Sequence, residues 1–173
     1  MAGLTLWTVG HSNRTLEEFL EILAEAGIDT LADVRRFPGS RRQPHFSSEQ
    51  LEASLEAAGV RYVHLPELGG RRKVQPGSRN TAWRNASFQA YADHIASEEF
   101  AAGLERLLEL ARAGRTALMC SEAVWWRCHR GLVADRLKAD GFEVLHLMGG
   151  GKVQEHPYTS AARITDGELS YEG

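Results

Sequence analysis

Short apolar runs alternate with longer segments of helical periodicity along the chain. The short runs contain many β-branched and aromatic residues, which is typical of strands buried on both faces of a sheet. We expect five such strands, at residues 4–9, 30–34, 61–65, 116–120 and 143–148. The longer segments repeat apolar residues at the spacing of an α-helix. We expect five helices, at residues 16–26, 48–58, 87–95, 98–113 and 129–140.

Local signals at the ends of these segments support the helices. Thr15 and Glu18 have the spacing of a capping box, in which two side chains satisfy backbone amides of the first turn. Ser47 and Gln50 have the same spacing. A glycine after a helix favours the left-handed conformation that ends it. We expect this conformation at Gly27, Gly59, Gly114 and Gly141.

The alternation of strands and helices indicates the fold class. Right-handed crossovers between parallel strands give a doubly wound sheet. We therefore expect a three-layer α/β fold with a mostly parallel, Rossmann-like sheet of about five strands and helices on both faces. The tail 163–171 reads as a hairpin around Asp166 and Gly167, packed at an edge. No linker interrupts the chain, so we expect one domain over 1–173.

Composition limits the classes of function. Hydrophobic residues make up 43% and charged residues 25% of the chain, as in ordinary globular proteins. A formal net charge of −3 disfavours wholesale coating of nucleic acid. The opening MAGLTLWTVGHSN lacks a basic region and no apolar stretch is long enough to span a bilayer, so we expect no signal peptide and no membrane partner. Two cysteines do not form a secreted disulfide framework, which favours the cytoplasm.

Polar residues follow the predicted strands at one edge of the sheet. Ligands of open parallel sheets bind beyond the carboxyl ends of the strands, where these residues meet. Histidines follow or occupy the ends of four of the five strands, which evenly hydrated loops would not require. The ligand-binding candidates from this edge are Ser12, Arg14, Asp33, Arg35, His64, Gly69, Gly70, Arg71 and Arg130. The candidates for proton transfer are His11, Glu122 and His129.

Three arginine pairs, at 35/36, 41/42 and 71/72, lie in the loops at this edge. Any one loop arginine is more often simply solvated. As a group they predict a locally positive rim on an acidic chain, which suits a phosphate or carboxylate ligand. An anionic small molecule or nucleotide is therefore the expected partner.

The segment CSEAVWWRCHRG, residues 120–131, concentrates the reactive side chains. Cys120 ends a buried strand, and Cys128 lies at or just before a helix N-terminus. Helix-end amides and the neighbouring Arg127 and Arg130 favour a thiolate at this position. A lowered pKa makes a cysteine nucleophilic at neutral pH, so Cys128 is the first candidate for the reactive group and Cys120 the second.

Several alternatives to a reactive cysteine remain open. A metal site could combine Cys120, Cys128 and His129 with His11 or His64, although structural zinc usually takes cysteines two to four residues apart. A disulfide between the cysteines is geometrically possible, but a reducing compartment argues against a permanent one. Both thiols can also be inert packing. A phosphatase-type loop does not match, because six residues separate Cys120 from Arg127.

Tryptophans next to arginines add a hint about the ligand. Trp83 and Trp125 lie in segments that also contain arginines, where an indole can stack on a base or a sugar. An indole can equally anchor a lid. We include both residues as ligand-binding candidates, and a nucleic-acid partner stays possible.

The chain resembles a known family in several motifs taken together. The segments TVGHSNRTLEEFL, DVRRFPGSRR, YVHLPELGGRR, NTAWRNASF and MCSEAVWWRCHRGLVADRL are similar, in this order, to motifs of the domain of unknown function 488 family of bacteria and archaea. The resemblance covers nearly the whole chain up to about residue 150. It implies one α/β domain with Gly-His-Ser, Asp-Val-Arg and Cys-His-Arg elements, here at 10–12, 33–35 and 128–130. It implies no reaction.

The leading hypothesis is a cytoplasmic enzyme with one anion-binding cleft at the carboxyl edge of the sheet, acting on a phosphorylated or nucleotide-like ligand with assistance from cysteine. The first alternative is a non-catalytic module that binds nucleic acid or a metabolite. The second alternative is a metal-binding Cys/His protein. The sequence predicts no particular cofactor and no oligomeric state.

Overall fold

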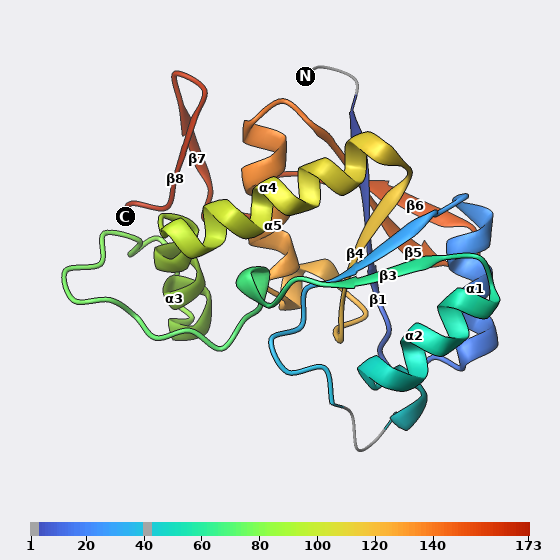
Figure 1. The fold of residues 1–173 in the computed structure, drawn as a ribbon. Helices are drawn as coiled ribbons and strands as arrows, with labels where there is room; N and C mark the ends of the chain where they lie inside the picture. Colours follow the sequence, from blue (N-terminus) through green and yellow to red (C-terminus); the bar gives the residue numbers. More distant parts are fainter. Residues whose placement is uncertain (1–3, 40–42) are drawn as a thin grey trace.

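Six strands form one mixed, mostly parallel sheet in the computed structural model, which describes residues 4–39 and 43–173 (Figure 1). The strands are β1 (Thr5–Gly10), β2 (Thr30–Asp33), β3 (Arg61–His64), β4 (Thr116–Cys120), β5 (Glu143–Gly149) and β6 (Lys152–Glu155). Their order is β3-β2-β4-β1-β5-β6, and β6 alone runs antiparallel to its neighbour. The five predicted strands and the α/β class are confirmed. The short strand β6, after the triple glycine, was not predicted.

The five predicted helices are also present. They are α1 (Leu16–Glu25), α2 (Ser48–Ala57), α3 (Ala86–Ile95), α4 (Glu98–Ala113) and α5 (Arg130–Ala139). Buried residues of α1 and α2 share one core with the side chains of Trp7, Val9 and Met119. Buried residues of α3, α4 and α5 share a second core with Leu6 and Leu118. The helices therefore cover both faces of the sheet, as the periodicity predicts.

Strand alternation decides which way the end of β4 faces. Successive side chains of a strand point to opposite faces of the sheet. Ala117 and Met119 belong to the core under α1 and α2, whereas Leu118 and Cys120 belong to the core under α4 and α5. The register of β4 therefore directs the Cys120 thiol toward α5.

The strand order places a crevice at the carboxyl end of β4. This strand lies between β1 and β2. The chain leaves β1 and β2 toward α1 and α2 on one face of the sheet, and it leaves β4 toward α5 on the other. Connections that diverge in this way open a crevice between them, which is where ligands of doubly wound folds bind.

Two of the predicted helix-end signals take a different form. The capping box of Thr15 and Glu18 is present with both hydrogen bonds. The predicted box at Ser47 is wrong, because its hydroxyl donates to the Pro44 carbonyl of the preceding turn and does not cap α2. The left-handed residue expected at Gly114 is also wrong: its φ is −176°, so the chain leaves α4 in an extended conformation.

The C-terminal hairpin is confirmed. It consists of β7 (Arg163–Thr165) and β8 (Glu168–Ser170) around Asp166 and Gly167, whose φ angles of 52° and 79° are those of a type I′ turn. The hairpin forms a separate two-stranded sheet that contacts α5. In the main sheet, β6 and not the hairpin pairs with the edge of β5.

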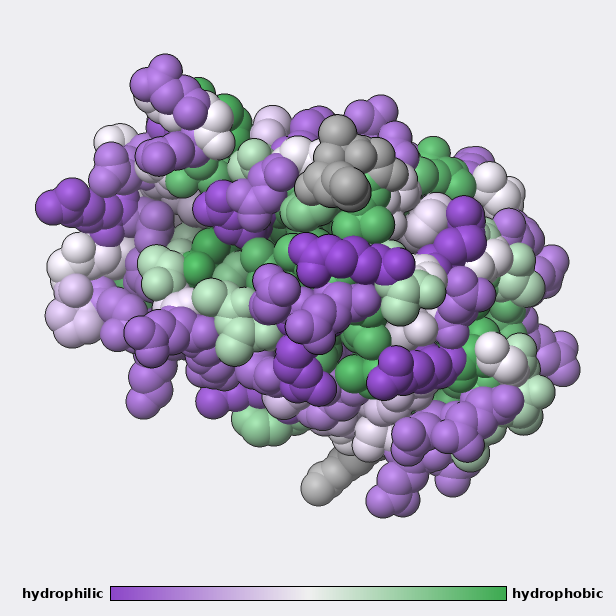
Figure 2. Space-filling model, turned by 45° about the horizontal axis from the view of Figure 1, so that its top comes forward, coloured by the Kyte–Doolittle hydropathy of each residue, from purple (hydrophilic) through white to green (hydrophobic). Residues whose placement is uncertain are grey.

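Hydrophilic side chains cover most of the face in Figure 2, with smaller hydrophobic areas between them. Within residues 4–39 and 43–173, none of the helices combines the length and apolar character needed to cross a bilayer.

Gly10 allows the end of β1 to approach the loop after β4. A Cβ atom at this position would lie 1.7 Å from the Glu122 carbonyl oxygen and 2.8 Å from Nη1 of Arg130. The close approach permits two backbone hydrogen bonds between these segments, from the His11 amide to the Cys120 carbonyl and from the Ser12 amide to the Ser121 carbonyl. The Gly-His-Ser turn is thereby fixed against the segment that contains both cysteines.

We predict that Gly10→Ala lowers the free energy of unfolding by about 1–3 kcal/mol, because the added methyl group overlaps backbone atoms that have no room to move. Denaturant unfolding measures the change. Gly39→Ala is the matched control, since a Cβ there meets no atom within 4 Å. Equal stability of the two variants would contradict the close-approach argument.

Candidate active site

A cavity of about 510 Å³ opens at the carboxyl end of β4. Eight residues predicted from the sequence line it, and they come from the segments that follow four strands, β1, β2, β3 and β4. These residues are His11, Arg35, Gly70, Arg71, Cys120, Glu122, Cys128 and His129. The structure therefore brings the Gly-His-Ser, Asp-Val-Arg and Cys-His-Arg turns to one hollow.

Several predicted residues lie behind this lining and hold it in place. Asp33 is fully buried and accepts hydrogen bonds from Arg35 Nε at 2.9 Å and Arg35 Nη2 at 2.7 Å. His64 Nε2 donates to the Arg35 carbonyl at 2.6 Å. Arg14 donates to the carbonyls of Gly10 and Met148, which ties the loop after β1 to the end of β5. These residues position the arginine of the Asp-Val-Arg turn and the loop beside it.

Backbone geometry accounts for two more predicted positions. A Cβ atom at Gly69 would lie 2.6 Å from the Arg36 Cα, so only glycine lets these two loops touch. Ser12 has a φ of 46° and Arg71 a φ of 60°. Left-handed backbone is uncommon for residues with a side chain and is concentrated at functional sites. Both residues lie at the carboxyl edge of the sheet.

His11 and Arg35 form one wall of the cavity. Nδ1 of His11 donates to the Ser12 carbonyl at 2.9 Å, which leaves Nε2 to accept from Nη1 of Arg35 at 3.3 Å. Burial is the main reason that the pKa of His11 falls to about 4. His11 is therefore neutral at pH 7 and acts as a hydrogen-bond acceptor toward the guanidinium.

Cys120 and Cys128 lie side by side in the opposite wall. Their sulfur atoms are 2.7 Å apart, and both cysteines are free thiols. Cys128 precedes the first turn of α5, and its sulfur accepts the backbone amide of Arg130 at 3.4 Å. A sulfur at the amide end of a helix is electrostatically favoured as a thiolate.

Arg130 places a positive charge next to both sulfur atoms. Its side chain is 1% exposed and its Nη1 lies 3.4 Å from Sγ of Cys120. The other partners of the guanidinium are the carbonyls of Glu122 and Ala123, and Nε has none. Among the described residues, no carboxylate lies within ion-pair distance of this guanidinium. A buried charge without a partner of opposite sign is costly, so Arg130 favours a negative charge on a thiol.

The two thiols respond to this environment in opposite directions. Burial opposes ionisation of Cys128, but the hydrogen bond between the two sulfur atoms and the charge and amide of Arg130 lower its pKa below the ordinary value. Burial raises the pKa of Cys120, and the hydrogen bond to Cys128 adds to that rise. Cys128 is therefore the thiol of the pair that loses its proton more readily.

His129 is positioned to take a proton from Cys128. Its Nε2 faces the Val34 carbonyl at 3.1 Å, and because a carbonyl only accepts, the proton of the neutral ring is assigned to Nε2. The lone pair of Nδ1 then faces Sγ of Cys128 at 3.4 Å. The ring of Tyr91, on α3, packs 4.9 Å from the imidazole and fixes its plane. A nucleophile, a base and an orienting group are thus in contact.

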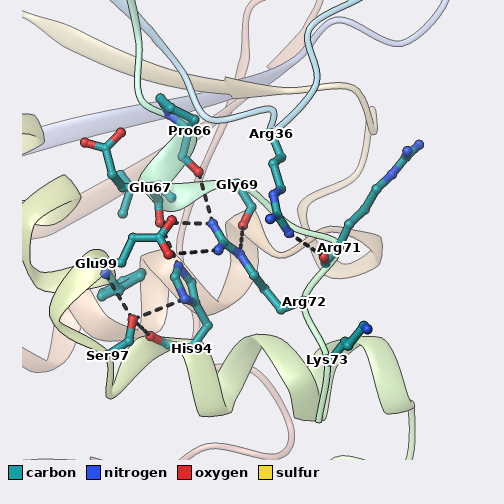
Figure 3. Close-up of polar contacts among 12 residues, drawn as sticks. Arg36, Pro66, Glu67, Gly69, Arg71, Arg72, Lys73, His94, Ser97 and Glu99 are labelled. Carbon is teal, nitrogen blue, oxygen red and sulfur yellow. Dashed lines mark hydrogen bonds and ion pairs between the residues drawn. The ribbon is translucent and has the colours of Figure 1, made fainter. Parts of the chain in front are cut away.

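Cationic side chains form the rim of the cavity. Figure 3 shows the guanidinium of Arg36 directed at the Arg71 carbonyl, which it reaches at 2.8 Å, while the Arg71 side chain extends away from these contacts. Both guanidiniums flank the ring of Phe37, at 5.4 and 5.6 Å from its centre, and Phe37 is 61% exposed. Within the described chain neither Arg36 nor Arg71 forms an ion pair with a carboxylate.

Arg72 differs from its neighbour Arg71. Its guanidinium pairs with Glu99 at 3.1 Å and donates to the carbonyls of Gly69 and Pro66 (Figure 3). Arg72 therefore stabilises the loop after β3 and does not line the cavity. The third predicted arginine pair, Arg41 and Arg42, lies outside the described residues.

The two tryptophans selected from the sequence lie in packed surroundings. Trp83 packs against Phe88 and Tyr171 with centroid distances of 5.0 and 5.8 Å. Trp125 is stacked on His146 at 5.0 Å and donates from Nε1 to Gln154. Neither contributes to the lining of the cavity. Phe37 is the exposed aromatic residue of the lining, and sequence reasoning missed it because it follows an arginine pair in a loop without periodicity.

Sequence reasoning also missed the contribution of α3. Ser87, Phe88 and Tyr91 line the cavity from this helix. Their helical spacing indicates packing, and no polar cluster marks them as part of a site. The sequence contains no signal that places this helix over the carboxyl edge of the sheet.

His146 belongs to a separate buried network. It accepts from the Thr8 hydroxyl, and its Nε2 donates to Nδ1 of His156 at 2.8 Å. His156 in turn donates to Asp135 at 2.8 Å. Burial, His156 and Arg130 together lower the pKa of His146 to about 2, so this ring is neutral. His146 shares the histidine pattern of the strand ends but is not part of the cavity lining.

A metal site has no ligand set among the described residues, where no three His, Cys, Asp or Glu side chains are arranged to hold an ion. Cys120, Cys128 and His129 are engaged with one another and with Val34.

A match to one protein family covers most of the chain. The family described as "Domain of unknown function DUF488" matches residues 15–137. The chain belongs to this DUF488 family. The match contains the Asp-Val-Arg and Cys-His-Arg turns and ends within α5, whereas the resemblance was expected to reach about residue 150. His11 and Ser12 precede it. No curated protein and no solved structure matches the chain.

We predict that Arg130→Met raises the pKa of Cys128 by about one to three units, because the charge that favours the thiolate is removed. The pH dependence of iodoacetamide alkylation, read by peptide mass spectrometry, gives the midpoint for Cys128. Arg136→Met, on the solvent side of α5, is the control and should leave that midpoint unchanged. An unchanged midpoint in Arg130→Met would mean that Arg130 does not set the charge of the thiol.

Proposed function

We propose that this protein is an enzyme whose cavity binds an anionic, nucleotide-like ligand and uses Cys128 as its reactive group. The observation that carries the proposal is the thiol of Cys128 in the cavity wall, beside a buried guanidinium without a carboxylate partner. A low-pKa thiolate in a partly enclosed hollow is typical of a catalytic cysteine. We also propose that the chain acts as a single domain in the reducing cytoplasm.

The charge balance of the cavity supports an anionic ligand. Arg36, Arg71 and Arg127 contribute three cationic side chains without ion pairs in the described structure, and Glu122 contributes one carboxylate. The cavity is also lined by the rings of Phe37 and Phe88. Guanidiniums recognise phosphates and carboxylates, and the aromatic rings offer faces for a planar group. A phosphate attached to a base combines both requirements.

In this proposal each group around the thiol has a role. Cys128 attacks an electrophilic centre of the ligand, and His129 receives or returns the proton through Nδ1. Arg35, held by Asp33 and His11, presents its remaining N–H groups to the cavity. Glu122 is exposed at the mouth and is the second candidate for proton transfer.

We predict that phosphorylated ligands protect Cys128. Inorganic phosphate and a nucleoside monophosphate should slow alkylation of Cys128 at least about threefold at saturation, because the bound anion covers the thiolate. The uncharged nucleoside should protect less than its phosphate. Arg71→Ala should weaken protection, and Arg79→Ala, an exposed arginine outside the cavity, should not.

Two results would overturn this proposal. Equal protection by the nucleoside and its phosphate would exclude anion recognition. No protection by any phosphorylated ligand, with both variants indistinguishable from the parent protein, would remove the cavity as the binding site.

A non-catalytic module that binds single-stranded nucleic acid is the second candidate, favoured by the exposed Phe37 near the guanidiniums of Arg36 and Arg71. An exposed ring near cations can stack a base while the cations contact phosphates. This function predicts oligonucleotide binding that weakens as salt rises and is unaffected by Cys128→Ser. Fluorescence anisotropy with Phe37→Ala tests it: a loss of affinity below about threefold would exclude stacking on this ring.

A further inference from the structure

The cavity contains two cysteines in contact, although an anion-binding site requires none and a single nucleophile requires only one. The chain has two cysteines, and their sulfur atoms lie 2.7 Å apart in the wall of the cavity. They come from different elements, since Cys120 ends β4 and Cys128 precedes α5. The register of β4 and the loop that returns to α5 therefore converge on this contact.

The two thiols differ in their exposure to solvent and in the direction in which their pKa values are shifted. Both cysteines line the cavity, but Cys128 is 7% exposed whereas Cys120 is only 1% exposed. Cys128 carries the lowered pKa and Cys120 the raised one. In thiol–disulfide exchange the thiolate attacks, and a neighbouring thiol resolves the mixed disulfide. Access and charge select Cys128 for the attack and Cys120 for the resolution.

We propose that the cavity is a thiol–disulfide exchange site that reduces the disulfide of an anionic small molecule, with Cys128 attacking and Cys120 resolving. The substrate class rests on the proposed function, because the arginines of the rim supply the attraction for the anion. The contact between the two sulfur atoms supplies the chemistry independently of that function.

Two exchange steps complete the reduction. In the first, the Cys128 thiolate attacks one sulfur of the substrate disulfide, a Cys128–substrate disulfide forms, and the other half of the substrate leaves as a thiolate. In the second, the Cys120 sulfur attacks Sγ of Cys128, and the bound half leaves as a thiol carrying the proton of Cys120. Two electrons pass from the cysteine pair to the substrate. A low-molecular-weight thiol, two molecules per turnover, restores the pair by the reverse exchange.

Arg130 and His129 assist the second step. When Cys128 is bound to substrate, Cys120, whose sulfur lies 3.7 Å from the Glu122 carbonyl oxygen, must lose its proton to attack. Nη1 of Arg130 lies 3.4 Å from Sγ of Cys120 and stabilises the negative charge that develops there. Nδ1 of His129, next to Cys128, can pass the proton of Cys120 to the departing sulfur.

The test uses the full chain, reduced and freed of reductant, with two disulfide probes. Dithiobis(nitrobenzoate) is anionic and releases a coloured thiol, and dithiodipyridine is its uncharged counterpart. The parent protein should release two thiols per chain. The first release should depend on probe concentration and the second should not, because the second is intramolecular. Intact mass should then show an internal disulfide and no retained probe.

Variants separate the roles of the cysteines. Cys120→Ser and Cys120→Ala should each release one thiol and retain the probe on Cys128. Cys128→Ser should react at least about tenfold more slowly in the first step, because the accessible thiolate is missing. The rate ratio of the anionic to the uncharged probe should fall in Arg71→Ala and stay at the parent value in Arg79→Ala. Far-ultraviolet circular dichroism confirms that each variant is folded.

The failures of the two proposals are distinguishable. Retention of the probe by the parent protein, or a second release proportional to probe concentration, would overturn the exchange site while leaving phosphate protection of Cys128 intact. An intramolecular second release with equal probe ratios in the parent protein and Arg71→Ala would overturn the anionic substrate. Loss of phosphate protection alone would overturn the proposed function and leave the cysteine pair as an exchange site.

Discussion

A buried guanidinium without a carboxylate is the constraint on which the candidate site depends. Arg130 is 1% exposed, and its partners are carbonyl oxygens and the sulfur of Cys120. Carbonyl dipoles reduce the cost of burying the charge but do not neutralise it. The ionisable groups closest to it are thiols, so part of the cost is recovered when one of them becomes an anion. The lowered pKa of Cys128 is thus a consequence of how α5 is packed.

The sheet topology is what brings this charge to a cavity. Because β4 lies between β1 and β2 and its connection crosses to the opposite face, the first turn of α5 stands over the crevice. Gly10 allows the β1 turn to touch the β4 loop, and Gly69 allows the loop after β3 to touch the Arg36 backbone. Four loops distant in sequence therefore share one hollow. Backbone hydrogen bonds join the β1 turn to the β4 loop, and side-chain contacts such as that of His129 with the Val34 carbonyl join the β4 loop to the β2 loop.

The sequence predicts well which loops meet at the carboxyl edge of the sheet, because the periodicities of the strands and helices decide which loops lie there. Eight of the selected residues line one cavity on that argument alone. The sequence does not distinguish which of several similar neighbours is buried. Arg130 is enclosed whereas Arg127, three positions earlier, is exposed. Trp125 is stacked on His146, while the adjacent Trp126 is 51% exposed. Such choices depend on the rotation of a short loop and the packing of distant segments.

Local helix-end signals show the same limit. The boxes at Thr15 and Ser47 have identical spacing, yet only Thr15 caps its helix. Pro44 begins a short helical turn just ahead of Ser47, and that turn offers its carbonyl to the serine hydroxyl. A competing acceptor nearby in the chain decides the outcome, and a spacing rule does not detect it.

Helix α5 contains a buried anion as well as a buried cation, and the two are kept apart. Asp135 is fully buried and accepts hydrogen bonds from the His156 ring, the Thr159 amide and hydroxyl, and the Tyr171 hydroxyl. These donors come from the segments after β6 and β8, so the C-terminal part of the chain satisfies this carboxylate. If Asp135 paired with Arg130 instead, the guanidinium would be neutralised and the thiols would lose the charge that favours ionisation. By engaging Asp135 elsewhere, the C-terminal segments leave Arg130 to act on Cys120 and Cys128.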